Sequence, residues 1–582
     1  QPVYSIVAKN SNSKEQGRFV SVINDTLEKL VKDGINERTI EAGINYYEFK
    51  YREADYGPYP KGLMYYLTMM DSWLYDETKP FIHIEAGDTF DELKKDARNG
   101  YFEKLIKEYL LDNNHKSIIS LVPEYGLEKE KEQKEADKLA EYKSTLTNDE
   151  LEELVKKTKE LKEYQDTPSS QEDLEKIPML ELSDIKREPA KDYNDVKSVD
   201  GIKIVHHNIF TNKIAYINMS FDTKCVPDEL IPYMGLLGST LSLMDTKNYT
   251  YPELTNEINI NCGGLATGTA LYSDKVDFSK NTIVYEVKSK ALYEKVPFVL
   301  GMMEEIMYNT RFDDYKRLKE IIARIKSRLE ASLMGQGHSI AMLECCAQFS
   351  ESAYYSDILR GYKYYEFIKK LDEEFEQNKT QIVDKLNKLV GYIFNKDNVI
   401  VSLTADDEGY DCFVKALSAK SCNIKDEHYN TAVRSFIPVN VKTGYTSASQ
   451  VQYVARCGNF VKDGYKYTGA LKVLKVIFSY DYLWINVRVK GGAYGCMSGS
   501  SRNGDFYMVS YRDPNLEKTN DIYEGAADYI RNFNVSRRDM VKFIIGTIGE
   551  IDAPLTPSAI GSRSFTHYMC NCTEDMLRKD RE

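Results

Sequence analysis

The sequence predicts an α+β fold made of tandem modules, each a mixed or antiparallel sheet with helices packed on it. Three observations lead to this prediction. A unit of one short apolar strand, a polar turn and two amphipathic helices occurs three times, starting near residues 5, 282 and 507. A highly charged helical stretch separates the first unit from the second. The composition, 42% hydrophobic and 29% charged over 582 residues, is that of a globular chain of several domains.

Each repeated unit is expected to place its second helix at a residue that caps helices well. These residues are Asn36, Asp313 and Ser536, whose short polar side chains accept a hydrogen bond from the first turn. A further apolar strand is expected after the first two units, in "HKSIISLVPE" (115–124) and in "KDNVIVSLTAD" (396–406).

More elements are expected ahead of the second and third units. Strands are expected at 201–210 and 213–223, and helices near 228–243 and 251–260. The third unit has a strand at 450–460 and a helix near 468–480 ahead of it. Only four residues precede the first unit, and the third ends at Glu582 without a final strand. The chain is therefore expected to begin and end inside modules, as a piece of a longer polypeptide.

The charged stretch predicts two helices joined near residues 144–147. Thr147 and Glu150 have the spacing of a capping box, which starts the second helix. The leucines Leu151, Leu154 and Leu161 are too few for a coiled coil of more than about two heptads. We expect a solvated connector, which in a chain of paired modules could act as a hinge.

The stretch "RVKGGAYG", residues 488–495, predicts a site. Alternating apolar residues before Arg488 indicate a strand, and Gly491 and Gly492 would open its end to a close backbone approach. Arg488 and Tyr494 would be polar groups at that opening. From these residues alone, Arg488 could equally pair with a structural carboxylate, and Tyr494 could pack in the core.

Charge and cysteine content bound the partners and the compartment. A net charge of -13 argues against nucleic acid as the main partner. The sequence contains no apolar run of about 18 residues, so no membrane span is expected. Ten cysteines without a regular pattern predict free thiols, and favour a reducing intracellular compartment such as the cytoplasm or an organelle matrix.

Five segments in this order resemble one family. They are "FKYREADYGPYPKGLMYYL" (49–67), "MDSWLYDETKPF" (70–81), "SLMGQGHSIA" (332–341), "RVKGGAYG" (488–495) and "VSYRDPNLEKTNDIYEGAADYIRNF" (509–533). Through essentially its whole length, the chain resembles the C-terminal half of a pitrilysin-type zinc metallopeptidase, in the presequence protease and falcilysin branch.

The resemblance implies a division of the chain into modules. Residues 1–123 would be the latter part of a second module, truncated at its start, and residues 124–195 a helical hairpin that serves as hinge or linker. Residues 196–428 would be a third module, and residues 429–582 a fourth module truncated at its C-terminus. Family members close like a clamshell around a peptide chamber.

The family's zinc site, a His-x-x-Glu-His motif with a distal glutamate, belongs to the first module. None of the seven histidines of this chain forms that motif or its inverse. His206 and His207 are neighbours on opposite faces of an expected strand, and His567, Cys570 and Cys572 match no standard zinc spacing. We therefore expect no metal ligands in this chain, and zinc only in the full-length enzyme.

The resemblance also implies roles for "RVKGGAYG". Arg488 and Tyr494 match a pair that reaches across the chamber and hydrogen-bonds the substrate near the scissile carbonyl. A guanidinium and a phenol are donors suited to an oxygen that gains negative charge. Gly491 and Gly492 would contact substrate through their backbone.

Two functions follow as expectations. In the first, the chain is the substrate-chamber half of a zinc metalloendopeptidase that degrades unfolded peptides, such as targeting peptides, and is inactive alone. Its partners would be those peptides and its own N-terminal half, covalent or separate. In the second, the chain is a non-catalytic structural or binding subunit that pairs with a separate zinc-bearing chain.

Overall fold

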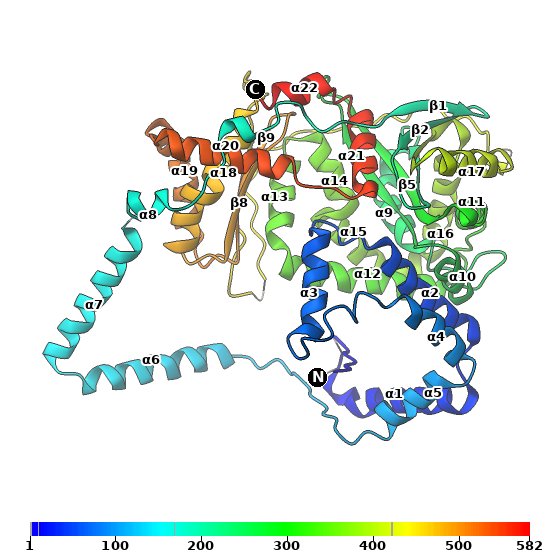
Figure 1. Cartoon of the computed structure of the whole chain (residues 1–582), viewed down its shortest axis with the longest axis horizontal. Coiled ribbons are helices and arrows are strands. Elements are labelled where there is room, and N and C mark those ends of the chain that lie inside the picture. The colour runs from blue at the N-terminus through cyan, green and yellow to red at the C-terminus, as the bar shows by residue number, and fades with distance from the viewer. Residues whose placement is uncertain (1–2, 10, 168, 421–422, 448) are drawn as a thin grey trace. The chain divides into compact units, whose positions relative to one another are not determined.

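The computed structural model describes residues 3–9, 11–167, 169–420, 423–447 and 449–582. Contacts divide the chain into two compact units (Figure 1). Unit 1 comprises Gln1–Glu37 and Lys95–Leu180, and unit 2 comprises Arg38–Lys94 and Glu181–Glu582. The four module boundaries predicted from the sequence are finer than this division and stay a proposal.

Unit 1 is helical throughout its described elements. These are η1 (Ser13–Glu15), α1 (Gln16–Asp33), α5 (Tyr101–Leu105), the π-helical η2 (Ile106–Leu111), α6 (Leu127–Thr145), α7 (Asn148–Asp166) and α8 (Gln171–Glu175). Gly34, at φ +80°, ends α1 in a conformation that favours glycine. The next backbone N–H, of Ile35, donates to Glu103 Oε1 at 2.9 Å, which ties α1 to α5.

Two strands predicted in this unit do not form. Residues 5–9 and 115–124 are irregular, and their apolar side chains lie in solvent; Val7 is 70% exposed and Leu121 95%. A strand needs a neighbour to satisfy its backbone N–H and C=O groups. The described residues of unit 1 contain no other strand that could serve as one.

The charged connector is confirmed as two helices, α6 and α7. Thr147 and Glu150 form the predicted capping box, with the Thr147 N–H donating to Glu150 Oε2 at 2.8 Å. Figure 1 shows the two helices diverging from their joint rather than lying side by side. Their leucines stay exposed, Leu154 by 42% and Leu161 by 55%, because neither helix has an apolar stripe wide enough to hold the other.

Unit 2 contains a six-stranded sheet in the order β1-β2-β6-β3-β5-β4. Only β2 and β6 run parallel, so the sheet is mixed, as predicted. The strands are β1 (Asp195–Val199), β2 (Ile202–Asn208), β3 (Ile214–Asp222), β4 (Leu265–Ser273), β5 (Asn281–Leu292) and β6 (Val399–Ala405).

Helices cover this sheet and bury its apolar residues. They are α9 (Ile231–Thr240), α10 (Tyr251–Asn261), α11 (Val296–Tyr308), α12 (Tyr315–Gly335), α13 (Gly337–Ala347), α14 (Glu351–Arg360), α15 (Tyr362–Glu373), α16 (Phe375–Ile393) and α17 (Asp407–Ser418). Phe221 and Phe394 meet edge to face at 5.1 Å in the core. Burying each such ring contributes about 1.5–3 kcal/mol, so the sheet and its helices form a stable scaffold.

A second, three-stranded sheet has the order β7-β9-β8. Its strands are β7 (Ala455–Asn459), β8 (Gly495–Ser500) and β9 (Asp505–Tyr511), and its helices are α18 (Ala470–Ile477), α19 (Glu517–Arg531), α20 (Arg537–Ile551), α21 (Pro557–Met569) and α22 (Glu574–Lys579). The order matches β3-β5-β4 of the larger sheet, and β5 and β9 are the strands that open two of the predicted repeats. The repeat is therefore confirmed inside unit 2.

Segments distant in sequence pack against the larger sheet. Helix α2 (Glu37–Glu53) brings Glu53 to Lys290 at 2.5 Å, and after it come α3 (Lys61–Trp73) and α4 (Gly87–Ala97). Helix α21 approaches the sheet through Gly561, where a Cβ would lie 1.8 Å from Thr404 Oγ1. Among the described residues, no helix is both long and apolar enough to cross a bilayer.

Candidate functional site

Arg488 lies on a helix and not, as predicted, at the end of a strand. Helix α18 continues through the π-helical turns η8 (Phe478–Tyr482) and η9 (Trp484–Val489). Leu483 and Val487 are fully buried and four residues apart, which is a helical spacing. The alternation that suggested a strand arose because Trp484, Ile485 and Val489 are also apolar, although all three are exposed.

Gly491 and Gly492 end this helix. Gly492, at φ +82°, donates its N–H to Arg488 O at 2.8 Å, and Ala493 donates to Val487 O at 3.1 Å. This resembles the glycine-ended C-cap of α-helices, shifted by the π-helical turn. A Cβ on Gly491 would lie 2.4 Å from Val487 O, so only glycine fits there. The predicted contact of these glycines with substrate stays a prediction.

The Arg488 guanidinium lies among aromatic rings. Its Cζ is 4.0 Å from the ring centre of Trp484 and 5.6 Å from that of Tyr494. None of the described residues forms an ion pair with Arg488. The alternative of a structural carboxylate partner therefore finds no support, and the charge of Arg488 is held by rings while its N–H groups stay available.

Tyr494 directly precedes β8 and is exposed. Its side chain is 66% accessible, so the alternative of a core tyrosine is wrong. The ring meets that of Tyr511, in β9, edge to face at 5.8 Å, and the Tyr494 N–H donates to Arg512 O at 3.2 Å. Backbone and ring contacts thus hold the phenol in place while its hydroxyl faces solvent.

The segment 509–533 supports the segment 488–495. Asn515 donates its side-chain N–H to Gly491 O at 2.6 Å, which fixes the turn after the arginine. Asp513 is fully buried and accepts from the Asn515 N–H at 2.9 Å and from Thr519 Oγ1 at 2.7 Å. Two of the segments that carry the family resemblance therefore form one local structure.

A third of those segments, 332–341, reaches the same place. The ring of His338 lies 4.8 Å from that of Tyr511, and the ring of Tyr453 lies 5.8 Å from it. A Cβ on Gly337 would lie 2.2 Å from Tyr453 Cδ2, so glycine permits the contact. We call Trp484, Arg488, Tyr494, Tyr511, Tyr453 and His338 the aromatic cluster.

Sequence reasoning missed three members of the aromatic cluster: His338, Tyr453 and Tyr511. Two of them stand inside segments already singled out, and this was the available signal. His338 Nδ1 is buried without a hydrogen-bond partner among the described residues. Burial also lowers the pKa of His338, which favours the neutral ring with one donor and one acceptor nitrogen.

The two neighbouring histidines of β2 serve the fold. His207 is fully buried, with Nδ1 on Tyr193 O and Nε2 on Ser402 Oγ at 2.9 Å. A carbonyl can only accept, so Nδ1 carries the proton and Nε2 accepts from the serine. Burial lowers the pKa of His207 to about 4, against a smaller opposite effect of Tyr193. His206 donates from Nε2 to Ala405 O at 3.0 Å and stacks on Tyr410 at 4.6 Å.

His567 has a carboxylate partner, not a cysteine. Its Nδ1 lies 2.7 Å from Asp192 Oδ2, and Arg563 lies 3.3 Å from the other oxygen. Burial acts to raise the pKa of Asp192, but hydrogen bonds and charge from these two partners lower it overall. Cys570 and Cys572 are free thiols, as are all nine cysteines that the structure describes; Cys422 lies outside the described residues.

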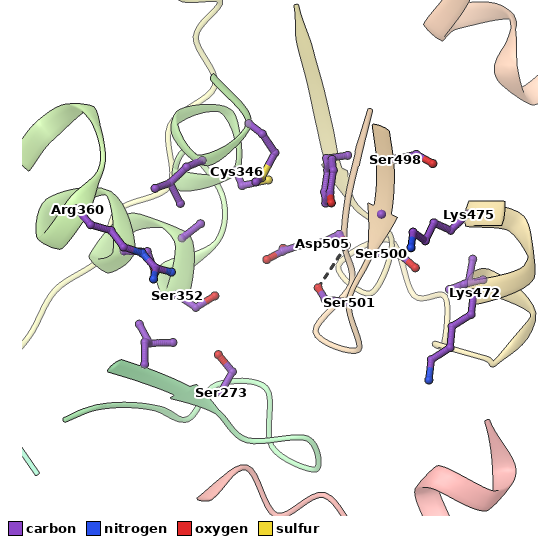
Figure 2. A pocket seen from close by; sticks show the side chains of 18 residues that line it. Ser273, Cys346, Ser352, Arg360, Lys472, Lys475, Ser498, Ser500, Ser501 and Asp505 are labelled. Atoms are coloured by element: carbon purple, nitrogen blue, oxygen red, sulfur yellow. Dashed lines mark hydrogen bonds between the residues drawn. The ribbon is translucent and has the colours of Figure 1, made fainter. Parts of the chain in front are cut away.

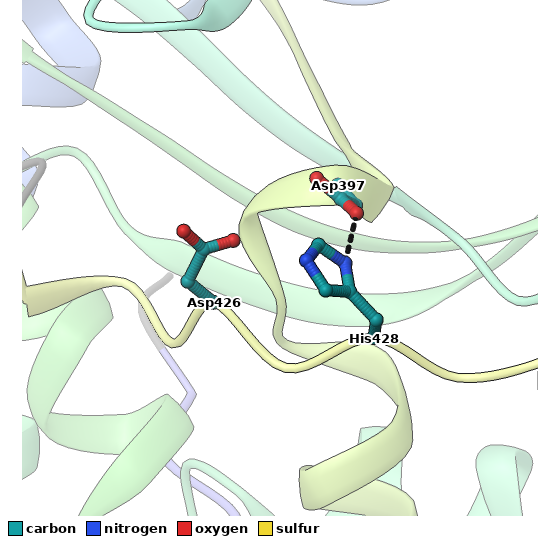
Figure 3. Close-up of side chains that lie close together, drawn as sticks. All are labelled: Asp397, Asp426 and His428. Atoms are coloured by element: carbon teal, nitrogen blue, oxygen red, sulfur yellow. Dashed lines mark ion pairs between the residues drawn. The ribbon is translucent and has the colours of Figure 1, made fainter.

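One group of side chains in the described residues has the proximity that a metal site needs. It consists of Asp397, Asp426 and His428, all exposed, on and near the turn before β6 (Figure 3). His428 Nδ1 is already 2.5 Å from Asp397 Oδ2. This set has one histidine where the resemblance implies two with a glutamate, and none of its members is buried. The residues present do not fit the family's zinc site.

Comparisons with known proteins agree with the arrangement of these segments. A family model for the domain associated with subfamily C of the M16 peptidases matches residues 121–371, and the one described as "PreP C-terminal domain" matches residues 444–582. The chain is 40% identical to "Protein HypA" of Clostridium perfringens over 100% of this chain and 60% of that protein. It is 30% identical to "Presequence protease 1, chloroplastic/mitochondrial" of Arabidopsis thaliana over 100% of this chain and 54% of that protein.

The chain belongs to the pitrilysin-type peptidase family, in its presequence protease branch. A further relative is "Presequence protease, mitochondrial" of Yarrowia lipolytica, 25% identical over 100% of this chain and 58% of that protein. The chain thus spans between about half and three fifths of the length of these relatives. A solved peptidase M16 inactive domain from Pseudomonas fluorescens covers 67% of this chain and 90% of its own at 15% identity and a TM-score of 0.46, which is too low to support an argument.

Proposed function

We propose that this chain is the substrate-chamber half of a zinc metalloendopeptidase that degrades unfolded peptides. Arg488 and Tyr494 hold the substrate near the bond that is cleaved and stabilise the oxygen that gains negative charge. The zinc ligands belong to the N-terminal half of the longer protein, which this chain needs for activity. The relatives named as presequence proteases support targeting peptides as one substrate class.

One observation carries the proposal: Arg488 and Tyr494 lie side by side with their donor groups free. The guanidinium carbon is 5.6 Å from the centre of the tyrosine ring, and no carboxylate among the described residues neutralises the charge. Two donors of this kind, one charged and one neutral, suit a carbonyl oxygen that becomes an oxyanion. A structural role would not need both groups facing solvent.

The exposed apolar segments of unit 1 support a missing partner. Residues 3–7 and 117–122 have strand-like sequences, and Val3 and Ile119 are 87% and 79% exposed. In our proposal these segments complete a sheet with residues of the N-terminal half. Such pairing would satisfy backbone groups that water alone solvates in this chain.

A cleavage assay with a quenched fluorescent peptide tests the proposal. The chain alone should be silent, and restoring the N-terminal half should give cleavage that requires zinc. In the restored enzyme, Arg488→Ala should lower kcat/KM by about 100-fold or more, because one stabilising donor is lost. Lys490→Ala, which removes an exposed cation just beyond η9, is the matched control.

Two results would contradict the proposal. Cleavage by the chain alone, dependent on zinc, would show that the metal site lies within these residues. Equal activity of Arg488→Ala and Lys490→Ala in the restored enzyme would favour the other function expected from the sequence, a non-catalytic subunit.

A further inference from the structure

Unit 2 contains a cavity of about 510 Å³ that the proposed chemistry does not use (Figure 2). Its walls come from α13, α14 and α18 and from strands β4, β8 and β9. The volume lies in the range of small-molecule sites. Strand β8 begins next to Tyr494 but reaches the cavity only with Ser498–Ser500, so the cavity and the aromatic cluster lie toward opposite ends of this strand.

The cavity walls combine apolar surface with an excess of positive charge. Leucines at 271, 343 and 471 contribute apolar surface from three different elements. The charged side chains are Arg360, Lys472 and Lys475 against a single acid, Asp505. Asp505 is already engaged, since it accepts from Ser350 Oγ at 2.7 Å and from Asn459 Nδ2 at 2.8 Å. An anion with an apolar body suits this lining.

Arg360 is the cation best placed to meet such an anion. Lys475 pairs with Glu550 at 2.7 Å and Lys472 with Asp580 at 3.3 Å. Among the described residues Arg360 has no carboxylate partner. Figure 2 shows its guanidinium leaving α14 toward the space that Ser352 and Asp505 also border. A guanidinium binds a carboxylate through two parallel hydrogen bonds, which a lysine cannot do.

Ser498 provides an independent sign that a polar ligand belongs here. The residue lines the cavity and is only 2% exposed, and its Oγ has no hydrogen-bond partner among the described residues. An unsatisfied buried hydroxyl costs about 1–3 kcal/mol. A ligand that donates to or accepts from this hydroxyl would remove the cost.

The strands that line the cavity favour a peptide over a simple anion. Strand β4 is the edge of the six-stranded sheet, and β8 is the edge of the three-stranded sheet. An edge strand has a row of backbone N–H and C=O groups without a partner in its sheet. An extended peptide can pair with such a row while its side chains fill apolar pockets beside it.

We propose that this cavity binds the C-terminal end of a short extended peptide. Its carboxylate would lie on Arg360, its last apolar side chain against the leucine walls, and a backbone group on Ser498 Oγ. The inference rests on the proposed function, because each cleavage by an endopeptidase leaves a peptide with a new carboxylate. It adds a second peptide site, distinct from Arg488 and Tyr494, that holds substrate or product by its end.

Calorimetric titration of the 582-residue chain tests the proposal without any cleavage. The probes are N-acetyl-Ala-Ala-Leu with a free carboxylate and the same peptide as its C-terminal amide. The acid should bind at least about 10-fold more tightly than the amide, because the amide loses the charged bidentate contact. Arg360→Gln should abolish that difference, and Ser498→Ala should weaken both peptides several-fold. Arg324→Gln, an exposed arginine of α12 away from the cavity, should bind as the wild type does.

The controls separate this proposal from the proposed function. Arg488→Ala should leave the titration unchanged, so a failure of the cleavage mechanism would not alter the result. Equal affinity for acid and amide, no detectable binding of the acid, or an unchanged preference in Arg360→Gln would overturn the second site. Displacement of the acid peptide by inorganic phosphate at equal affinity would overturn it too, because the cavity would then bind a simple anion.

Discussion

At the scale of single residues, the phenol of Tyr494 separates positioning from chemistry. Its ring contacts Tyr511 and lies beside Arg488, while its hydroxyl is free. A substitution that keeps the ring therefore removes one donor and little packing. This makes the tyrosine a cleaner probe of transition-state stabilisation than the arginine, whose loss also removes a cation from the cluster.

Tyr494→Phe should lower kcat/KM of the restored enzyme on the order of 100-fold, since one donor to the developing oxyanion is lost. The thermal unfolding midpoint should stay unchanged, because both ring contacts remain. Tyr480→Phe is the matched control, since Tyr480 is likewise 66% exposed. A similar rate loss in both variants would mean that the effect is not specific to Tyr494.

His207 should make stability depend on pH. Its pKa is about 4 in the fold, below the value near 6.5 of an exposed histidine. The unfolded chain therefore binds a proton first, and the free energy of unfolding should fall as pH drops from 6.5 to about 4. This residue should account for about 3 kcal/mol of that loss.

Denaturant unfolding followed across this pH range measures the contribution of His207. His207→Gln should be less stable at neutral pH but should lose less stability on acidification than the wild type. His83→Gln is the control, because His83 is exposed and meets water in both states. If the wild type and His207→Gln lose stability in parallel, the neutral buried state of His207 is wrong.

At the scale of elements, a glycine decides whether α13 can approach the aromatic cluster. Gly337 opens this helix, and a Cβ there would meet the ring of Tyr453 at 2.2 Å. Tyr453 also donates a hydrogen bond to Met334 O, so its ring is held from two sides. The position of His338 therefore depends on the absence of a side chain at its neighbour.

Gly337→Ala should displace Tyr453 and destabilise this joint by about 1–3 kcal/mol, the usual cost of overpacking. Hydrogen exchange of residues 337–347 and 451–455 should be faster in the variant. Gly335→Ala is a close control, because a Cβ on Gly335 has nothing within 4 Å. Equal exchange in the two variants would show that the Tyr453 ring moves aside without cost.

At the scale of the whole molecule, exposed apolar segments of unit 1 should make the chain associate with itself. Ile119 and Leu121 are 79% and 95% exposed in a strand-like stretch without a partner among the described residues. Such surface pairs readily with another copy. Light scattering should show mass rising with concentration, and the Ile119→Lys, Leu121→Lys double variant should lessen this.

The control for self-association is Ile177→Lys, since Ile177 is also an exposed isoleucine but lies outside this stretch. It should associate as the wild type does. Addition of the N-terminal half should reduce association of the wild type if the two halves share a sheet. Association that is the same with and without the double substitution would contradict the role of residues 117–122.

Much of the fold could be predicted because it is encoded locally. The strands that became β2, β3, β5, β6 and β9 have enough β-branched and apolar residues to be recognised without partners. Thr147 starts its helix, and Asp406 caps α17 by accepting from the Gly409 N–H at 3.1 Å. Such caps involve residues about four positions apart or fewer, so the sequence contains the whole interaction.

The strand expected before Arg488 shows where local patterns fail. Its apolar residues alternate as in a strand, yet they form π-helical turns because Leu483 and Val487 both reach the core. The strands expected at residues 5–10 and 115–124 failed for the opposite reason, since their described residues lack a neighbouring strand. In each case the outcome depended on what lay across from the segment.

The sequence by itself determined the family, the repeat of strand and helices, the absence of a His-x-x-Glu-His motif, and Arg488 with Tyr494 as the pair to test. Only the tertiary structure decided that Arg488 is on a helix, that His338, Tyr453 and Tyr511 join it, and that Arg360 and Ser498 border one cavity. The physical reason is range. Caps and periodicity act over a few residues, whereas the aromatic cluster and the cavity depend on packing between residues far apart in the chain, such as His338 and Tyr511.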